Sequence, residues 1–189
     1  LYVSDFYNRI IGHYEVPLEH PGRDRHRGRI WRVVYTGKGV EKPAATAPAT
    51  MVNVATAAPN ELITLLGHGN QTVRTLATHE LVDRVGQAAI KPLRAVLASD
   101  TSSPSSRVHA MWALERLGGL EPAAVDQLLA DRDRTVRTQV LKVLAERSWG
   151  DDPRVRAALQ DSDGFVRRSA ADALGRHPHA QNLKPLLDL

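Results

Sequence analysis

The chain has 189 residues, of which 42% are hydrophobic and 24% charged, a composition that excludes wholesale disorder. Its formal net charge is +4 at pH 7, and the lack of cysteine excludes disulfide scaffolds, thiolate zinc sites, cysteine nucleophiles and attached c-type haem within these residues. No apolar run reaches the roughly 18 residues that cross a bilayer, so no transmembrane segment is predicted. The sequence begins at Leu1 without an initiator methionine or a signal peptide. We therefore expect a fragment of a longer protein.

Residues 1–35 are predicted to form a small β piece. They hold six of the nine aromatic residues, and residues 1–50 carry eight Lys and Arg against five Asp and Glu. Residues 1–3 are apolar and residues 30–35 are rich in β-branched and aromatic types, which favours strands, whereas the glycines and prolines between them favour turns. Two or three such strands bury too little apolar surface to fold alone. We therefore expect this piece to complete a larger sheet or to dock on the rest of the chain.

Residues 36–59 are predicted to be a linker. Ala, Thr, Gly and Pro dominate this stretch, and no charged residue lies between Lys42 and Glu61. This composition is typical of a mobile or loosely docked connection. The chain therefore divides into a β piece over 1–35, the linker over 36–59, and a third part over 60–189.

The third part repeats. Four segments share a small polar turn followed by a helix that opens with Val and a basic residue, and successive Val positions are 35, 28 and 30 residues apart, which is typical of helical-pair solenoids. A polar residue three positions before each Val is expected to cap the helix. The expected caps are Asn70, Ser105, Asp133 and Asp163, and the Val and basic residues after them are Val73, Arg74, Val108, His109, Val136, Arg137, Val166 and Arg167.

Apolar residues continue at helical spacing after each Val, as in Val136, Val140 and Leu144. A shorter helix with its own apolar stripe precedes each of these helices. Residues 60–189 are therefore predicted to be mostly α, with about four helical pairs stacked as a right-handed solenoid. Because each pair contacts only its neighbours, the stack presents an extended concave surface suited to binding proteins or neighbouring domains.

This turn-Val-Arg pattern resembles HEAT repeats of the short, lyase-associated type over about residues 60–189. The resemblance implies a HEAT-like α-solenoid in which the turn Asp and the helix Arg form a ladder of ion pairs between neighbouring repeats. Four residues match those positions, namely Asp133, Arg137, Asp163 and Arg167. The first two repeats depart from the pattern at Asn70, Ser105 and His109. At a surface, such pairs contribute under about 1 kcal/mol each, so they are expected to set register rather than to carry function.

The first part carries a second resemblance. The stretches YVSDFYN at 2–8, IIGH at 10–13, RD at 23–24 and GRIWR at 28–32 resemble the closing blade of a β-propeller in large exported bacterial proteins of the membrane-bound dehydrogenase type. In those proteins a propeller similar to sugar dehydrogenases precedes HEAT-like repeats, and a c-type cytochrome module often comes after them. The order of blade, linker and helical pairs agrees with that layout. The resemblance implies a periplasmic or cell-envelope location.

The two resemblances lead to two candidate functions. In the first, the fragment is a non-catalytic connector and docking solenoid of an exported dehydrogenase-like protein, which passes electrons from sugar or alcohol oxidation to a haem domain. A quinone cofactor and c-type haem then belong to the parent protein, and none is expected here. In the second, it is a plain HEAT-repeat scaffold without a redox role. A third hypothesis, in which the blade completes an active site, also stays open.

The propeller resemblance also implies candidate catalytic residues beside the first strand. Some of them would face the central channel, where quinone-dependent relatives bind cofactor and substrate. The favoured alternative is that the acidic and amide side chains cap turns while the arginines cover the propeller rim. The candidates are Asp5, Asn8, His13, Arg23, Asp24 and Arg29.

No metal site is predicted. His13, His20 and His26 follow no tetrahedral ligand spacing, and Pro17 and Pro21 break any helix that would align them. The His79–Glu80 pair resembles deoxyhypusine hydroxylase superficially. That HEAT-repeat enzyme holds two irons through several such pairs. Because the sequence offers a single pair, we reject this enzyme as an identity for the chain.

Nucleic-acid binding is not predicted. Glu19 and Asp24 interrupt the arginine-rich run, and the repeats lack the basic stripe of a nucleic-acid solenoid. Trp112 lies within a predicted helix and is expected in the core. Trp149 comes after a turn and is the better candidate for an exposed contact with a partner.

Overall fold

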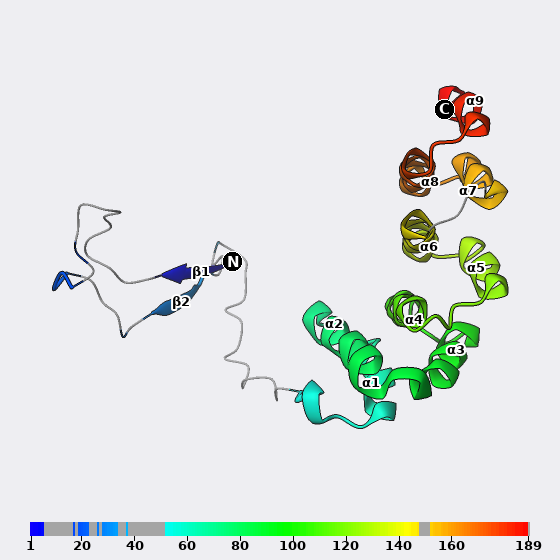
Figure 1. Cartoon of the computed structure of the whole chain (residues 1–189). Helices are drawn as coiled ribbons and strands as arrows, with labels where there is room; N and C mark the ends of the chain where they lie inside the picture. Colours follow the sequence, from blue (N-terminus) through cyan, green and yellow to red (C-terminus); the bar gives the residue numbers. More distant parts are fainter. Residues whose placement is uncertain are drawn as a thin grey trace. The chain divides into compact units, whose positions relative to one another are not determined.

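The computed structural model describes residues 1–5, 17, 19–22, 26, 28–33, 37, 52–147 and 152–188. The chain separates into two compact units, Leu1–Thr50 and Met51–Leu189. Each unit has its own secondary structure, a pair of strands in the first and a series of helices in the second (Figure 1).

The first unit contains the two predicted strands. β1 (Tyr2–Asp5) pairs antiparallel with β2 (Arg29–Arg32), so that Val3 lies opposite Trp31. The pairing continues one residue further, because the Val33 amide donates to the Leu1 carbonyl at 2.8 Å. Ile30 is 77% exposed. Two strands alone leave apolar side chains in water, which is why such a pair is marginal without further packing.

The second unit is mostly helical, as predicted, and its helices come in pairs. The first helices of the pairs are α1 (Pro59–Leu65), α3 (Ile90–Ala98), α5 (Pro122–Leu129) and α7 (Pro153–Ala157). A further helix, α9 (Ala180–Leu187), follows the last pair. The second helices are α2 (Gln71–Glu80), α4 (Pro104–Arg116), α6 (Arg134–Glu146) and α8 (Gly164–Arg176). The prediction of about four stacked helical pairs is therefore confirmed over these residues.

Three of the four predicted helix caps are confirmed. A side-chain oxygen accepts a hydrogen bond from a backbone N–H of the first turn at Asn70 (2.8 Å from the Thr72 nitrogen), Asp133 and Asp163. These bonds satisfy donors that the helix itself leaves without a partner.

The predicted cap of the second repeat is wrong. Ser103, not Ser105, caps α4, since its Oγ accepts from the Ser106 amide at 3.1 Å. Pro104 then occupies the first helical position, where its missing N–H costs nothing. The four caps are therefore 33, 30 and 30 residues apart. Ser106 and Arg107 take the places that the spacing assigned to Val108 and His109.

The core is a continuous apolar layer between the two rows of helices. Its fully buried side chains include Leu62, Leu93, Leu114, Val136 and Val166, one or more from each pair. Burial of apolar area at roughly 25 cal/mol per Å² drives the stacking. Figure 1 shows α2, α4, α6 and α8 along the inner side of the curve that this unit makes, with α3, α5 and α7 on its outer side.

Candidate binding surface

Two arginines on the inner helices reach carboxylates of the following repeat. Arg107 donates from Nε and Nη2 to the two oxygens of Asp131, at 2.8 and 3.1 Å. Arg137 does the same to Asp161, at 2.8 and 3.0 Å. Both pairs use the fork of the guanidinium, the geometry that makes an arginine–carboxylate contact strong and directional. The Arg107 side chain is only 7% exposed and that of Asp131 11%.

The same carboxylates hold the turn that leads into the next helix. Asp131 accepts from the Asp133 amide, and Asp161 from the Asp163 amide, both at 2.8 Å. The hydrogen bond from Arg137 and this amide lower the pKa of Asp161 below its usual value, although burial opposes the shift. Each rung of the ladder therefore fixes a loop as well as a distance between repeats.

The members of the ladder differ from those implied by the resemblance. Arg137 pairs with Asp161, two residues before the expected Asp163. Asp163 is the helix cap, and its other oxygen lies 3.4 Å from the Arg134 guanidinium. Because both of its oxygens are engaged in this way, Asp163 is not placed to bind Arg137 through the paired geometry. The rung of the second repeat is formed by Arg107 and Asp131. Because α4 is capped by Ser103, Arg107 and not His109 stands at the arginine position of this repeat.

The arginine of the first repeat faces a histidine. Arg74 Nε lies 3.4 Å from His109 Nε2, and His109 Nδ1 lies 2.9 Å from Thr78 Oγ1. The Thr78 hydroxyl donates to the Arg74 carbonyl, so it accepts from Nδ1–H of His109. Because Nε2 of the same ring accepts from Arg74 Nε–H, this contact requires neutral His109. Burial, and then the charge of Arg74, lower the pKa of His109.

All four arginines also brace the loop before their own helix. Nη1 of Arg74 donates to the His68 carbonyl, Arg137 to Asp131, and Arg167 to Asp161, at 2.7 to 2.8 Å. Arg107 contacts the Ser102 carbonyl in the same way. The predicted Arg74, Arg137 and Arg167 are therefore brought into equivalent places, whereas Val73 and Val108 are only partly buried beside the core.

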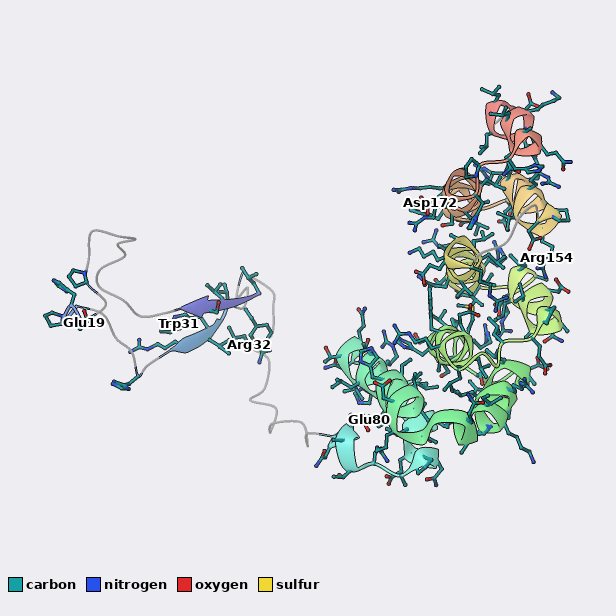
Figure 2. The ribbon with its side chains drawn as sticks, viewed as in Figure 1. Glu19, Trp31, Arg32, Glu80, Arg154 and Asp172 are labelled. Carbon is teal, nitrogen blue, oxygen red and sulfur yellow. The ribbon has the colours of Figure 1, made fainter. Side chains whose placement is uncertain are left out.

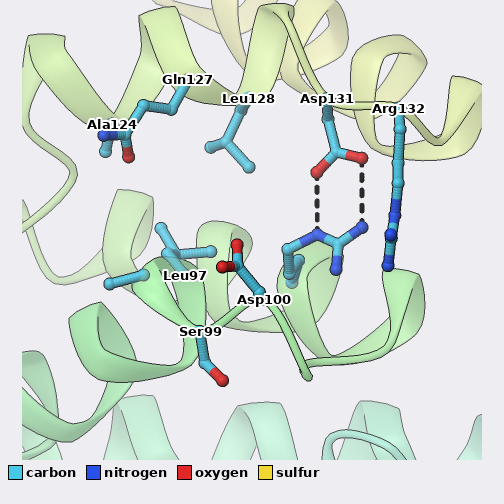
Figure 3. A pocket seen from close by; sticks show the side chains of 10 residues that line it. Leu97, Ser99, Asp100, Ala124, Gln127, Leu128, Asp131 and Arg132 are labelled. Atoms are coloured by element: carbon cyan, nitrogen blue, oxygen red, sulfur yellow. Dashed lines mark hydrogen bonds and ion pairs between the residues drawn. The ribbon is translucent and has the colours of Figure 1, made fainter.

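A groove of about 670 Å³ opens between α3 and α5 (Figure 3). The two hydrogen bonds to Asp131 cross its inner end, and Leu97 and Leu128 line it from opposite helices. Asp100 and Arg132 are exposed at its rim. Its charged groups are of both signs and its strongest pair is already satisfied, so the groove favours no single class of ligand.

A smaller groove of about 360 Å³ lies between the inner helices α6 and α8. The Phe165 ring is 60% exposed there, and the Arg134 guanidinium lies over it, 5.0 Å from the ring centroid. Figure 2 places Asp172 on the inner side of the curve and Arg154 on the outer side. The groove is lined by Thr138, Lys142, Phe165, Arg168, Ser169 and Asp172.

The candidate catalytic residues near the first strand are only partly placed. Asp5 and Arg29 are backbone partners in the β1–β2 pair, and the Arg29 guanidinium lies 5.6 Å from the centroid of Trp31. The other four, and the predicted contact residue, lie outside the described residues; they are Asn8, His13, Arg23, Asp24 and Trp149. Their catalytic and contact roles stay predictions.

Trp112 lies where it was expected, partly buried against the core, and its indole N–H donates to Gln139 Oε1 at 3.0 Å. Glu80, of the rejected diiron pair, accepts instead from Arg84 at 2.6 Å. Across the part of the chain that the structure describes, no three His, Asp or Glu side chains gather in a metal-binding arrangement. Within the same residues, none of the helices has the length and apolarity needed to span a membrane.

The important residues that the sequence did not indicate are Arg107, Asp131, Asp161 and Phe165. An Asp-x-Asp pattern at 131–133 and 161–163 was a usable signal for the two acids, because it recurs 30 residues apart. Phe165 carried no such signal, since an aromatic residue in a helix is ordinarily expected in the core.

A sequence model of HEAT repeats matches residues 59–145 and 121–189. The two matches overlap and together span the helical unit from α1 to the last residue. None of the curated proteins matches the chain.

Proposed function

Since this chain belongs to the HEAT-repeat family, we propose that its helical unit is a scaffold that binds another protein along its inner helices. The observation that carries the proposal is the row formed by α2, α4, α6 and α8, which run side by side along the inner side of the curve (Figure 1). Such a row offers one extended surface to which many side chains contribute.

The packing of the repeats supports this role. The bidentate pairs Arg107–Asp131 and Arg137–Asp161 join an inner helix to the turn that leads into the next inner helix, and they are mostly buried. A surface held at fixed spacing loses less entropy when it binds than one that must first be ordered. The exposed Phe165 adds an aromatic contact of the kind enriched at protein interfaces.

Affinity capture with matched surface variants tests the proposal. The full chain is used as bait in an extract of the cells that make it, beside a variant with Phe165→Thr and Arg168→Glu on the inner helix α8, and a control variant with Gln127→Thr and Lys91→Glu at exposed positions of the outer helices. We expect the same proteins to be recovered by the wild type and the outer variant and lost from the inner variant. Recovery unchanged by the inner substitutions, or lost only with the outer ones, contradicts it.

A finer proposal is the connector role in an exported bacterial dehydrogenase-like protein. On this proposal the β1–β2 pair is the last part of a propeller, the parent carries a quinone cofactor and c-type haem, and the location is periplasm or cell envelope. The exposed apolar side chains of the strand pair, among them Ile30 and Trp31, favour it, because they call for a larger sheet.

Sugar-dependent reduction of an artificial electron acceptor by the intact parent protein tests the connector. Activity that needs residues 60–189 behind the propeller supports docking of an acceptor on the helical unit. Activity that survives their deletion confines the chemistry to the propeller. If neither sugar nor alcohol supports reduction of the acceptor, the connector proposal fails and the plain scaffold without a redox role remains.

A further inference from the structure

The fourth repeat departs from the others at solvent-facing positions of its inner helix. Two residues after the cap, the first three repeats carry small hydroxyl residues, whereas the fourth carries Phe165. Five residues after the cap, Arg168 stands in place of smaller side chains. The equivalent residues of the earlier repeats are Thr72, Ser105 and Thr135 in the first set and Thr75, Val108 and Thr138 in the second.

Stacking of the repeats does not require these two departures, although the Arg134 guanidinium of α6 lies over the Phe165 ring, 5.0 Å from its centroid. The stacks α2–α4 and α4–α6 form with small residues at both positions, so a large ring and a guanidinium are not needed to join repeats. The Phe165 ring is 60% exposed, and Arg168 is exposed as well. An exposed aromatic ring beside an arginine is costly to leave in water and is characteristic of a binding surface.

The hollow opens here because of a third difference. Trp112 and Lys142 both lie nine residues after their caps. The Trp112 indole leans on the next helix and donates to Gln139, filling the space between α4 and α6. Lys142 is a thin, flexible chain in the same place between α6 and α8, and a space of about 360 Å³ remains. That volume is at the lower end of the range for ligand pockets.

The charges around the groove leave an excess of two cations. The nearby carboxylates are already paired, Asp172 with Arg176 at 3.1 Å and Asp163 with Arg134 at 3.4 Å. Lys142 and Arg168 have no hydrogen-bond or ion-pair partner among the residues that the structure describes. Two hydroxyl side chains, Thr138 and Ser169, line the same hollow and add neutral donors.

We propose that the groove between α6 and α8 binds an acidic segment of a partner protein, with carboxylates between Lys142 and Arg168 and an apolar side chain on the exposed Phe165 ring. This inference rests on the scaffold function proposed above and names the chemistry of its partner. Arginine and lysine beside hydroxyls recognise carboxylates through charge-assisted hydrogen bonds. Asp172 lines the groove and interrupts its cations, whereas a continuous phosphate backbone needs an unbroken row of cations.

The test uses the full chain and a defined probe. The probe is a fluorescein-labelled peptide of about ten residues in which Glu and Asp flank one Phe, and its control is the same peptide with Gln and Asn in their place. Binding is measured by fluorescence anisotropy at about 50 mM and about 300 mM salt. We expect saturable binding of the acidic peptide, weakened by salt, and no binding of the neutral one.

Paired variants locate the binding. The first pair combines Lys142→Gln with Arg168→Thr, and the threonine matches Thr138 of the preceding repeat. This pair should weaken binding of the acidic peptide about tenfold or more. Lys91→Gln with Arg132→Thr removes the same two charges from the outer helix α3 and from the loop before α6, and should leave binding unchanged. Circular dichroism checks that both variants keep their helix content. Equal weakening by both pairs means unspecific attraction and overturns the proposal.

Two further outcomes separate this inference from the scaffold function. If the acidic peptide does not bind but the inner-side variants still lose the captured partner, the acidic-segment inference fails and the scaffold stands. If neither occurs, both fail. A single-stranded oligonucleotide of equal charge that binds more tightly than the peptide, and does so through Lys142 and Arg168, also overturns the peptide assignment.

Discussion

Arg74, Arg107 and Arg137 occupy the same place in successive repeats and face different partners. Arg107 and Arg137 meet carboxylates, while Arg74 meets the neutral ring of His109. A buried guanidinium without a partner is unfavourable, because desolvation costs several kcal/mol per ion. The rungs therefore differ in strength and in their response to pH.

Removing the acid of the second rung should be costly. Asp131→Ala leaves Arg107, 7% exposed, without its carboxylate and also removes the acceptor for the Asp133 amide. We expect a loss of about 3 kcal/mol or more in the free energy of unfolding, measured by urea denaturation of the full chain. Asp100→Ala, at the exposed rim of the nearby groove, should change it by less than about 0.5 kcal/mol. Similar small losses for both would show that the rung is dispensable.

The contact between Arg74 and His109, which is the rung of the first repeat, should weaken in mild acid. Because the pKa of His109 is lowered in the folded protein, the unfolded chain takes up the proton first, and stability falls as the pH drops below the ordinary histidine value of about 6.5. Asp161, the carboxylate that pairs with Arg137, has a lowered pKa and loses its contribution only below about pH 4. Urea midpoints of the wild type and His109→Gln, compared between about pH 7 and about pH 5, should diverge, with the wild type losing more. Parallel curves would contradict a neutral His109 in this contact.

At the scale of elements, the start of α4 shows how a helix chooses among neighbouring serines. The Ser-Ser-Pro-Ser-Ser run at 102–106 offers several hydroxyls, and the one that precedes the proline becomes the cap. Proline at the first helical position fixes the backbone in helical geometry one residue after Ser103.

Alanine substitutions should separate the two serines. Ser103→Ala removes the acceptor for the Ser106 amide and should lower the free energy of unfolding by about 1 kcal/mol. Ser105→Ala, at the position that the spacing alone indicated, should leave it nearly unchanged or slightly higher, since alanine favours helices. The thermal midpoints of the two variants check this, and the reverse order would move the cap back to Ser105.

The helices could be predicted because each carries several consistent signals. Asn70, Asp133 and Asp163 each precede an apolar stripe of helical period. In each of these repeats the capping residue and the stripe indicate the same start of the helix. The register of α4 could not be read from its serine run. The Asp-x-Asp spacing marks the acids of the ladder, but the sequence does not show which aspartate caps the helix and which pairs with the arginine. Only the fold shows that Asp133 is the cap and that Asp131 meets Arg107.

The groove between α6 and α8 could not be predicted from the sequence for a related reason. It is marked by the contrast between Phe165, Arg168 and their equivalents in other repeats, and that contrast exists only once the repeats are aligned correctly. The alignment through Val108 placed the second repeat two residues away from the frame that the caps define. The strand pair was predictable from composition, since β-branched and aromatic residues dominate residues 30–35.

At the scale of the whole helical unit, stability comes from contacts between neighbouring repeats. A charge buried in one repeat should therefore weaken the unit beyond its own helix pair. Val136 is fully buried at the start of α6, between the second and fourth repeats.

Val136→Asp should disrupt the third pair, because it buries an unpaired charge. We expect a large loss of helical circular dichroism, or a thermal midpoint well below that of the wild type. Thr135→Asp introduces the same charge one residue earlier at an exposed position, where the helix dipole favours an acid, and should be tolerated. Equal tolerance of both would contradict the buried position of Val136.

The inner row of helices as the binding surface is tested most directly by site-specific photo-crosslinking. A photoreactive amino acid replaces either Asp172, on the inner side of the curve, or Arg154, on its outer side, in the full chain within an extract of the cells that make it. A protein partner should be crosslinked from position 172 and not from position 154. Crosslinking from 154 alone, or equally from both, would contradict an inner binding surface.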